Sequence, residues 1–233
     1  MSEPLYKMVY RRVIERIAEG TYPPGAMLPN EFDLAADLGV SQGTARKALS
    51  ALEDKAIVQR RQGKGTFVVL RTPENSLFHF FRLRTFDGVQ VTPEPAKETV
   101  IKRKASQNER ETLCDHPTHV FEITRVRSFK GQPFCMEQSV VPVELFPGLM
   151  ERTPLKNALY VMFQQAYSCI VISAEENLHA AIADAELADF MGIEKGIAVL
   201  VSERVTRDLL DRTVEMRKGV YVTNELTYFV EMN

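Results

Sequence analysis

The spacing of apolar residues over the first 55 positions predicts three helices. The first runs from about Leu5 to Glu19 and is followed by Gly20. The second follows Asn30, a good N-cap residue, and stops at Gly39, and the third follows the N-cap residue Ser41. The apolar residues at helical spacing are Val9, Val13, Ile14 and Ile17 in the first helix, Phe32, Leu34, Ala35 and Leu38 in the second, and Ala45, Ala48, Leu49 and Leu52 in the third.

A short hairpin is predicted directly after the third helix. The apolar-rich segments 56–59 and 66–70 flank a turn at 62–65, whose glycines permit the positive φ angle of a tight hairpin. The cations of this hairpin are Arg60, Arg61 and Lys64. The residues that the third helix leaves facing outward are Gln42, Gly43, Arg46, Lys47 and Ser50. Three helices followed by a basic hairpin predict a winged helix-turn-helix, whose exposed helix face suits a groove of double-stranded DNA.

Beyond residue 75 the pattern becomes rich in strands. The expected strands are 77–86, 97–104, 119–130, 132–142, 170–181, 198–208, 213–218 and 224–232, and the expected helices are 108–114, 155–167 and 184–191. Hairpin signals at Lys130-Gly131-Gln132 and near Lys218-Gly219 imply antiparallel pairing, so we expect an α+β fold. The predicted organisation is a winged helix-turn-helix domain over 1–70, a polar linker over 71–75 and a second domain over 76–233.

Length and charge change this picture little. A chain of 233 residues with 45% hydrophobic content is ordinary globular material for one or two domains. Residues 1–70 hold ten Lys and Arg against eight Asp and Glu, so the case for nucleic acid rests on where the cations lie. There is no apolar run of the roughly 18 residues that a membrane helix needs, and no signal-peptide core, so we expect a cytoplasmic protein without a membrane partner.

The cysteines and histidines give no strong sign of a cofactor. Cys114, Cys135 and Cys169 have no CxxC or zinc-finger spacing, so reduced structural thiols are expected. His116 and His119 are separated by a proline, with no carboxylate or cysteine pair nearby to complete a metal site. No metal or other cofactor is therefore predicted.

Several short motifs extend through the chain. In the first domain they are Pro4-Leu5-Tyr6, Pro24-Gly25, Leu28-Pro29-Asn30-Glu31, the run from Thr44 to Leu49, and the run from Arg61 to Val68. In the second they are Arg125-Val126-Arg127, Glu137, the run from Glu144 to Leu149, Leu159-Tyr160, Glu215 and Tyr221. A chain with these motifs resembles the GntR family of bacterial transcription regulators. Its second part is similar to the HutC-type effector domain called UTRA, an α+β, chorismate-lyase-like fold with an antiparallel sheet.

The resemblance indicates how the first domain would contact DNA. Its contact residues are expected to be Gln42, Thr44, Arg46 and Lys47 on the third helix and Arg61, Gly63 and Lys64 in the hairpin. We expect Arg46 to read a base, helped by Thr44 and Gln42, and we expect Lys47 and Arg61 to hold phosphates. The glycine and lysine at the hairpin tip should enter or skirt the minor groove.

Two positions depart from the family pattern on this surface. Relatives usually carry an arginine where this chain has Phe32 and another where it has Gln42. Since bidentate arginine to guanine is the commonest specific contact, the loss predicts an altered operator. Gln42 would favour adenine if it reaches a base.

The second domain offers a candidate anion site. Arg125 and Arg127 are two apart on a predicted strand, so both project from one sheet face, where paired guanidiniums would clamp an anion. Across the hairpin, Glu137 shares a face with Cys135 and Ser139 and could orient a hydroxyl or amine of the same ligand. The alternative is an Arg–Glu cross-strand pair that only stabilises the sheet.

The resemblance adds three residues to this effector site. It implies that Glu215 and Tyr221 read hydroxyl groups and that Tyr160 forms a pocket wall or a phosphate partner. Relatives that bind sugar phosphates carry a serine where this chain has Ala158, so a carboxylate or another small anion is equally compatible.

Together these features predict a homodimeric, ligand-responsive repressor that reads a two-fold operator and is released by a small anion, either a carboxylate or a sugar phosphate. Two alternatives remain open at this point. One is an enzyme with a chorismate-lyase-like pocket, although its arginines and glutamate lack a positioned nucleophile. The other is a regulator that senses thiol oxidation or a metal, for example through Cys135.

Overall fold

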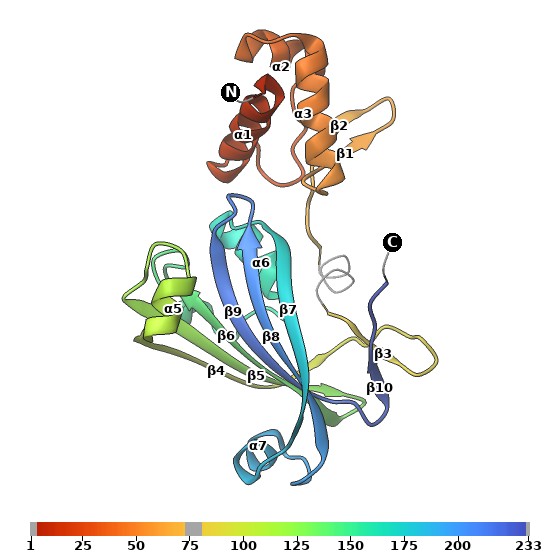
Figure 1. Ribbon diagram of the computed structural model, residues 1–233, viewed down its shortest axis with the longest axis vertical. Coiled ribbons are helices and arrows are strands. Elements are labelled where there is room, and N and C mark those ends of the chain that lie inside the picture. The colour runs from red at the N-terminus through yellow and green to blue at the C-terminus, as the bar shows by residue number, and fades with distance from the viewer. Residues whose placement is uncertain (1–3, 73–80, 232–233) are drawn as a thin grey trace. The chain divides into compact units, whose positions relative to one another are not determined.

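The computed structural model describes residues 4–72 and 81–231 (Figure 1). The described residues form two compact units, of which the first consists of residues 4–72, 160–172 and 208–211. The second consists of residues 81–159, 173–207 and 212–231. Within the described residues, no helix is both long and apolar enough to span a membrane.

Three helices form most of the first unit: α1 (Leu5–Ala18), α2 (Glu31–Leu38) and α3 (Gln42–Asp54). The predicted caps are confirmed, because the side chain of Asn30 accepts a hydrogen bond from the backbone N–H of Asp33. The side chain of Ser41 likewise accepts one from the backbone N–H of Thr44. The core of the unit includes the apolar residues expected on α1 and α3, together with Leu34 and Ala35 of α2.

Phe32 is the exception among the apolar residues predicted at helical spacing, because 70% of it is exposed. At about 100° per residue, it lies roughly a quarter turn outside the face that Leu34, Ala35 and Leu38 share. The short helix α2 therefore buries its apolar stripe without its phenylalanine.

The predicted hairpin is present as β1 (Val58–Arg61) and β2 (Gly65–Val68), paired antiparallel. Gly63 in the turn has a φ of 69°, the left-handed conformation for which glycine was expected. Arg71 follows the hairpin and was expected to belong to an exposed linker, yet it is buried, and its backbone N–H donates to Oε1 of Gln164 over 2.9 Å. Nε2 of Gln164 donates in turn to the carbonyl oxygen of Val69. Residues 73–75 of the expected linker lie outside the described residues.

The second unit is built on a six-stranded sheet with the order β4-β5-β6-β9-β8-β7. Its strands are β4 (Glu94–Lys104), β5 (His119–Phe129), β6 (Gln132–Pro142), β7 (Val171–Ile182), β8 (Ala198–Asp208) and β9 (Thr213–Val222), and β3 (Leu83–Thr85) pairs with β10 (Leu226–Tyr228) in a separate ribbon. The helical segments of this unit are α5 (Gln107–Thr112), the 3-10 turn η1 (Met150–Arg152) and α7 (Ala185–Met191). Helix α6 (Leu159–Tyr167) belongs to the first unit from residue 160 onward. The pairings β4–β5, β5–β6, β6–β9 and β8–β9 are antiparallel, which confirms the predicted α+β class.

Two predicted features of this unit were wrong. The expected helix 155–167 begins only at Leu159, because the carbonyl oxygens of Lys156 and Asn157 accept hydrogen bonds from arginine side chains of β5. The turn expected near Gly219 does not exist, because β9 continues through it and pairs Gly219 with Glu137 and Ser202. By contrast, the hairpin predicted at residues 130–132 is confirmed between β5 and β6.

Gly219 is required for close packing instead of for a turn. A Cβ atom at this position would lie 2.5 Å from the hydroxyl oxygen of Tyr221 and 2.7 Å from Cζ of the same ring. Tyr221 is itself buried, so its ring has little room to move. A glycine in a strand interior commonly marks such a close approach.

Replacing Gly219 with alanine is therefore expected to lower the free energy of unfolding by about 1–3 kcal/mol, the usual cost of overpacking. Urea denaturation would measure the loss, with Gly43→Ala as the control. A Cβ at Gly43 meets only Ser41 Oγ, 3.9 Å away, so alanine there should leave stability unchanged or raise it. In a double-mutant cycle, Gly219→Ala and Tyr221→Ala together should cost less than the sum of the two single changes. Additive effects would contradict the proposed clash.

Candidate functional site

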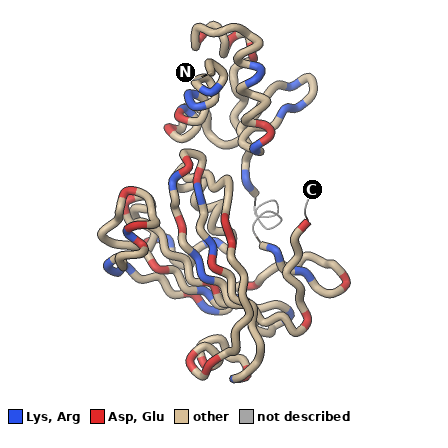
Figure 2. Tube along the Cα trace, in the orientation of Figure 1, with Lys and Arg blue, Asp and Glu red and all other residues tan. Residues whose placement is uncertain are grey.

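The outward face of α3 carries the polar residues predicted for DNA contact. Gln42, Arg46 and Lys47 are exposed, and Thr44 is half-buried with its hydroxyl 2.8 Å from that of Ser41. Figure 2 shows that Lys and Arg residues lie on both α3 and the β1–β2 hairpin. The first unit thus presents cations from two adjacent elements.

Glu31 organises the arginines of this surface. Its Oε2 accepts a hydrogen bond from Nε of Arg46 over 2.8 Å, and its Oε1 lies 3.7 Å from Nη2 of Arg60. Arg60 is also paired with Glu53 at 3.1 Å and donates to Ser50 Oγ. The Arg46 side chain is 63% exposed, so this guanidinium stays accessible to a further partner.

Aromatic rings support two other cations. Nζ of Lys47 lies 4.4 Å from the centre of the Tyr6 ring, and the guanidinium carbon of Arg61 lies 4.6 Å from the centre of the Phe67 ring. Lys64 is exposed beside Gly63 at the tip of the hairpin. A groove of about 750 Å³ extends between this hairpin and the starts of α2 and α3.

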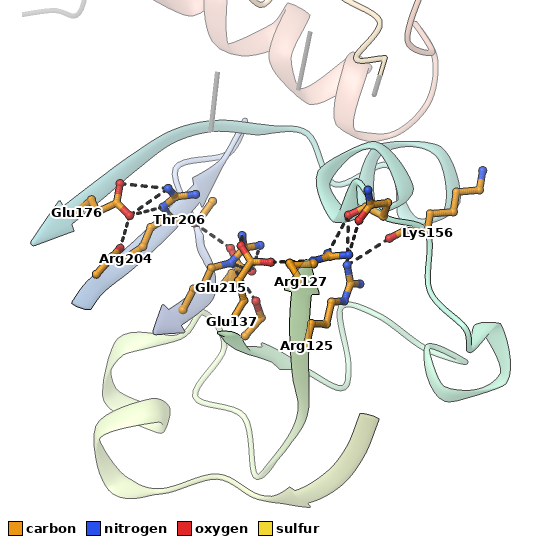
Figure 3. Close-up of polar contacts among 12 residues, drawn as sticks. Arg125, Arg127, Glu137, Lys156, Glu176, Arg204, Thr206 and Glu215 are labelled. Atoms are coloured by element: carbon orange, nitrogen blue, oxygen red, sulfur yellow. Dashed lines mark hydrogen bonds and ion pairs between the residues drawn. The ribbon is translucent and has the colours of Figure 1, made fainter. Parts of the chain in front are cut away.

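The second unit holds Arg125 and Arg127 side by side, buried on β5, as their two-residue spacing predicted (Figure 3). Nη1 of Arg125 donates to the carbonyl oxygens of Lys156 and Asn157 over 3.3 and 3.2 Å. Nη2 of Arg127 donates to the carbonyl oxygen of Asn157 over 3.1 Å, and its Nη1 donates to the Asn157 side chain. Both guanidiniums therefore point toward the segment that precedes α6.

Arg125 retains unused donor capacity. Its Nε lies 3.1 Å from Oε2 of Glu98 in an ion pair whose angle does not make a hydrogen bond. Its Nη2 is buried and has no hydrogen-bond partner among the described residues. Burial and the neighbouring charge of Arg127 lower the pKa of Arg125 to about 10.

A network of carboxylates and guanidiniums continues across the sheet (Figure 3). Oε1 of Glu137 accepts from Nη1 of Arg217 over 2.9 Å, and its Oε2 lies 3.4 Å from Nε of Arg127. Glu215 is fully buried and accepts from Arg217 and from the hydroxyl of Thr206. The Arg–Glu cross-strand pairing, which was the alternative to an anion site, is thus present, and Arg217 and Thr206, which were not predicted, extend it.

A second carboxylate centre lies further along the sheet. Glu176 on β7 accepts from Nη2 of Arg204 over 3.0 and 3.1 Å and from the hydroxyls of Ser202 and Tyr228. Burial would raise the pKa of Glu176, but Arg204 and these donors together lower it. Each of the four arginines on this face is matched by at least one glutamate, so the cluster is close to charge-balanced.

The remaining predicted site residues lie in apolar surroundings. Tyr221 belongs to a core cluster that includes Phe134 and Cys135, and burial raises its pKa well above the usual range. Tyr160 on α6 is buried, with its ring centre 6.1 Å from that of Phe163. Tyr160 belongs to the first compact unit, so its expected role in the anion site stays a prediction.

Comparisons with known proteins agree with this architecture. Residues 5–68 match the model of the bacterial regulatory proteins of the gntR family, and residues 99–227 match the model of the UTRA domain. The chain belongs to the GntR family, with a UTRA domain.

This GntR-family chain is similar to transcriptional regulators over nearly the whole length of both chains. It is 28% identical to the transcriptional repressor NagR of Bacillus subtilis, with 97% of this chain and 93% of NagR covered. It is 26% identical to the mannosyl-D-glycerate system repressor MngR of Escherichia coli, covering 97% of this chain and 95% of that one. The ligand-binding domain of a GntR-family regulator from Bordetella bronchiseptica covers 66% of this chain and is itself 98% covered, with a TM-score of 0.62 and 26% identity. The GntR-family chain is therefore a ligand-responsive DNA-binding transcriptional regulator and not an enzyme.

The structure also bears on the thiol and metal alternatives. Cys135 is fully buried, and that burial raises its pKa well above the ordinary thiol value, whereas a reactive cysteine needs an accessible thiolate. Within residues 4–72 and 81–231, no group of three or more His, Cys, Asp or Glu side chains could hold a metal ion.

Several residues of the polar cluster were not anticipated from sequence. They are Glu98, Asn157, Glu176, Arg204, Thr206, Arg217 and Tyr228. The pairs Arg204 with Thr206 and Glu215 with Arg217 carry the same two-residue spacing that identified Arg125 and Arg127. Glu98 and Asn157 have no such signal, because they reach the site through strand register and through a loop.

Glu137 should contribute to stability in a pH-dependent way. Burial would raise its pKa, but the surrounding arginines, Arg217 foremost, outweigh that effect and hold it at about 2, against an ordinary 4.5. The folded state therefore binds this proton less readily than the unfolded state does. The stabilisation is complete above about pH 4.5 and is lost as the pH falls toward about 2, a total of about 3 kcal/mol.

The Glu137→Gln variant is expected to be less stable at pH 7, because Arg127 and Arg217 lose a buried counter-charge. Between pH 4.5 and 2, its free energy of unfolding should also fall less steeply than that of the wild type. Urea denaturation at a series of pH values would measure both effects. Glu203→Gln, an exposed residue of β8, is the control and should keep the wild-type slope. Parallel curves for Glu137→Gln and the wild type would contradict the assignment.

Proposed function

We propose that this regulator is a homodimeric repressor that binds a two-fold operator and is released when a small anion binds at Arg125 and Arg127. The observation that carries the proposal is the buried Nη2 of Arg125, which lacks a hydrogen-bond partner among the described residues and lies in the same cluster as Arg127. A buried charged donor without a partner is costly, so a ligand that satisfies it gains binding free energy. A planar guanidinium pair suits a carboxylate or phosphate group.

The anion would compete with the protein's own backbone. In the structure, carbonyl oxygens of Lys156 and Asn157 accept hydrogen bonds from the two arginines. A carbonyl carries only a partial charge, and charge-assisted hydrogen bonds are roughly twice as strong as neutral ones. A bound anion would therefore take over these donors and free the 156–157 segment. Ala158 supplies no hydroxyl to such a ligand, so a carboxylate and a phosphate both remain candidates.

The freed segment is continuous with α6. Within the first unit, Gln164 of α6 holds the backbone of Val69 and Arg71, directly after the β1–β2 hairpin. Residues 156–164 thus connect the anion site to the segment that carries the hairpin. Anion binding would favour one of two arrangements of this connection, and DNA binding would favour the other.

The other residues of the cluster would shape the anion site. Glu137 lies next to Arg127 and is placed to accept a hydrogen bond from a hydroxyl or amine of the ligand. Glu215 is fully buried and bonded to Arg217 and Thr206, which supports a positioning role for it. Tyr221, on the same strand as Glu215, would read a hydroxyl group of the ligand.

On the DNA side, the ion pair with Glu31 supports base reading by Arg46. With Nε bonded to the carboxylate, the terminal nitrogens of Arg46 would bind O6 and N7 of a guanine. Gln42 and Thr44 would read neighbouring bases. Lys47 and Arg61, held against aromatic rings, would clamp phosphates, and Gly63 with Lys64 would approach the minor groove.

Arg46 and Lys47 provide a direct test of these DNA roles. Arg46→Ala should weaken operator binding about 10- to 100-fold and remove the preference at one base pair of each half-site. Lys47→Ala should weaken binding to all sequences alike and make the salt dependence of affinity shallower. Fluorescence anisotropy at several salt concentrations, with cognate and single-substituted duplexes, would separate the two patterns. An Arg46→Ala variant with unchanged base preference would contradict the assignment.

The anion site can be tested by thermal shift against carboxylates, amino acids and sugar phosphates. A ligand at 100 times its Kd should stabilise the wild type by about 2.7 kcal/mol and should release operator DNA. Arg125→Lys keeps the charge but not the planar donor pair, so it should lose most of this response. The matched control is Arg103→Lys, which alters an arginine paired with Glu109 and Glu122 elsewhere on the same sheet and should respond like the wild type. An equal ligand response in Arg125→Lys would exclude Arg125 as the anion receptor.

A further inference from the structure

The DNA-facing groove of the first unit contains an exposed aromatic side chain that none of the roles above uses. Phe32 is 70% exposed, more than any other large apolar side chain that the structure describes in this unit. It lines the groove of about 750 Å³ together with Gln42 and the hairpin residues 60–66. Met27, which is 60% exposed, lines the same groove. The groove therefore joins an apolar patch to the polar start of the recognition helix.

The neighbours of Phe32 are already engaged with other groups. Glu31 accepts from Arg46. The Asp33 carboxylate accepts from Nδ2 of the cap residue Asn30, and the Asp33 backbone N–H donates to Oδ1 of Asn30. The exposed phenyl ring of Phe32 adds an apolar surface to this part of the groove. A phenyl ring cannot donate a hydrogen bond to a phosphate, so it cannot act as a backbone clamp.

In the major groove of B-DNA, the apolar group that distinguishes base pairs is the 5-methyl of thymine, and phenylalanine is among the side chains that contact it. The N-terminal residues of a recognition helix contact base edges, and Gln42 is the first residue of α3. Phe32 and Gln42 line the same groove, so both side chains would face the same stretch of a duplex bound there.

We propose that Phe32 is a specificity-determining residue that contacts the 5-methyl group of a thymine in each operator half-site. Gln42 would read an adenine close to that thymine by its amide. This reading of the methyl group rests on the proposed docking of α3, but it is separable from the base preference of Arg46.

The test replaces single thymines by deoxyuridine, which removes only the methyl group. The operator is first selected from randomised duplex DNA with the full chain, and each thymine is then exchanged in turn. For the wild type, one position per half-site should lose about fourfold in affinity, the value expected for one buried methyl group. Phe32→Ala should bind the thymine and deoxyuridine duplexes equally. Phe32→Arg should exchange the thymine preference for guanine.

Phe86→Ala is the matched control, because Phe86 is 71% exposed on the second unit, and this variant should discriminate thymine from deoxyuridine as the wild type does. Since Phe32 is exposed, its variants should keep the wild-type melting temperature. Three results would overturn the proposal: a selected operator without thymine in its half-sites, a wild type insensitive to deoxyuridine at every position, or a Phe32→Ala variant that still discriminates. None of these results would alter the base preference assigned to Arg46, which Arg46→Ala tests independently.

Discussion

The second unit is organised around one constraint, the need to neutralise four arginines, three buried and one half-buried, on a single face of its sheet. Burying an isolated charge is costly, and a buried ion pair is tolerated only when its geometry satisfies both partners. Here Arg125 lies beside Glu98, Arg127 and Arg217 share Glu137, and Arg204 is paired with Glu176. These groups come from all six strands of the sheet, so correct strand register and charge neutralisation depend on each other.

Charge balance also determines how such a site could sense an anion. A cluster with a large positive surplus would attract many anions without discrimination. In this cluster, the glutamates already neutralise most of the arginine charge, and the Arg125–Arg127 end donates to neutral carbonyl oxygens. Selectivity would then come from a ligand that replaces those carbonyls and also satisfies Nη2 of Arg125. This geometry concentrates recognition at the segment that leads into α6.

Local rules recovered much of the fold from sequence. Asn30 and Ser41 cap their helices as predicted, since capping depends only on residues three apart. The two-residue period of a strand, which is also a local property, placed Arg125 and Arg127 on one face. Tertiary contacts decided the rest: Gly219 is needed for the Tyr221 ring, Asn157 is drawn to arginines instead of into a helix, and Glu98 meets Arg125 through pairing of β4 with β5. Such contacts leave no periodic signal in the chain.

The coupling between the anion and the operator is tested most directly by titrating one anion calorimetrically into two samples. One sample holds the free protein, and the other holds the protein saturated with operator DNA. Linkage requires the anion to bind the operator complex more weakly, by the same factor by which the anion weakens operator binding. A matching reduction of at least several-fold is expected for the wild type. Arg125→Lys should abolish both this reduction and the response to the anion. Equal anion affinities in the two samples would contradict it.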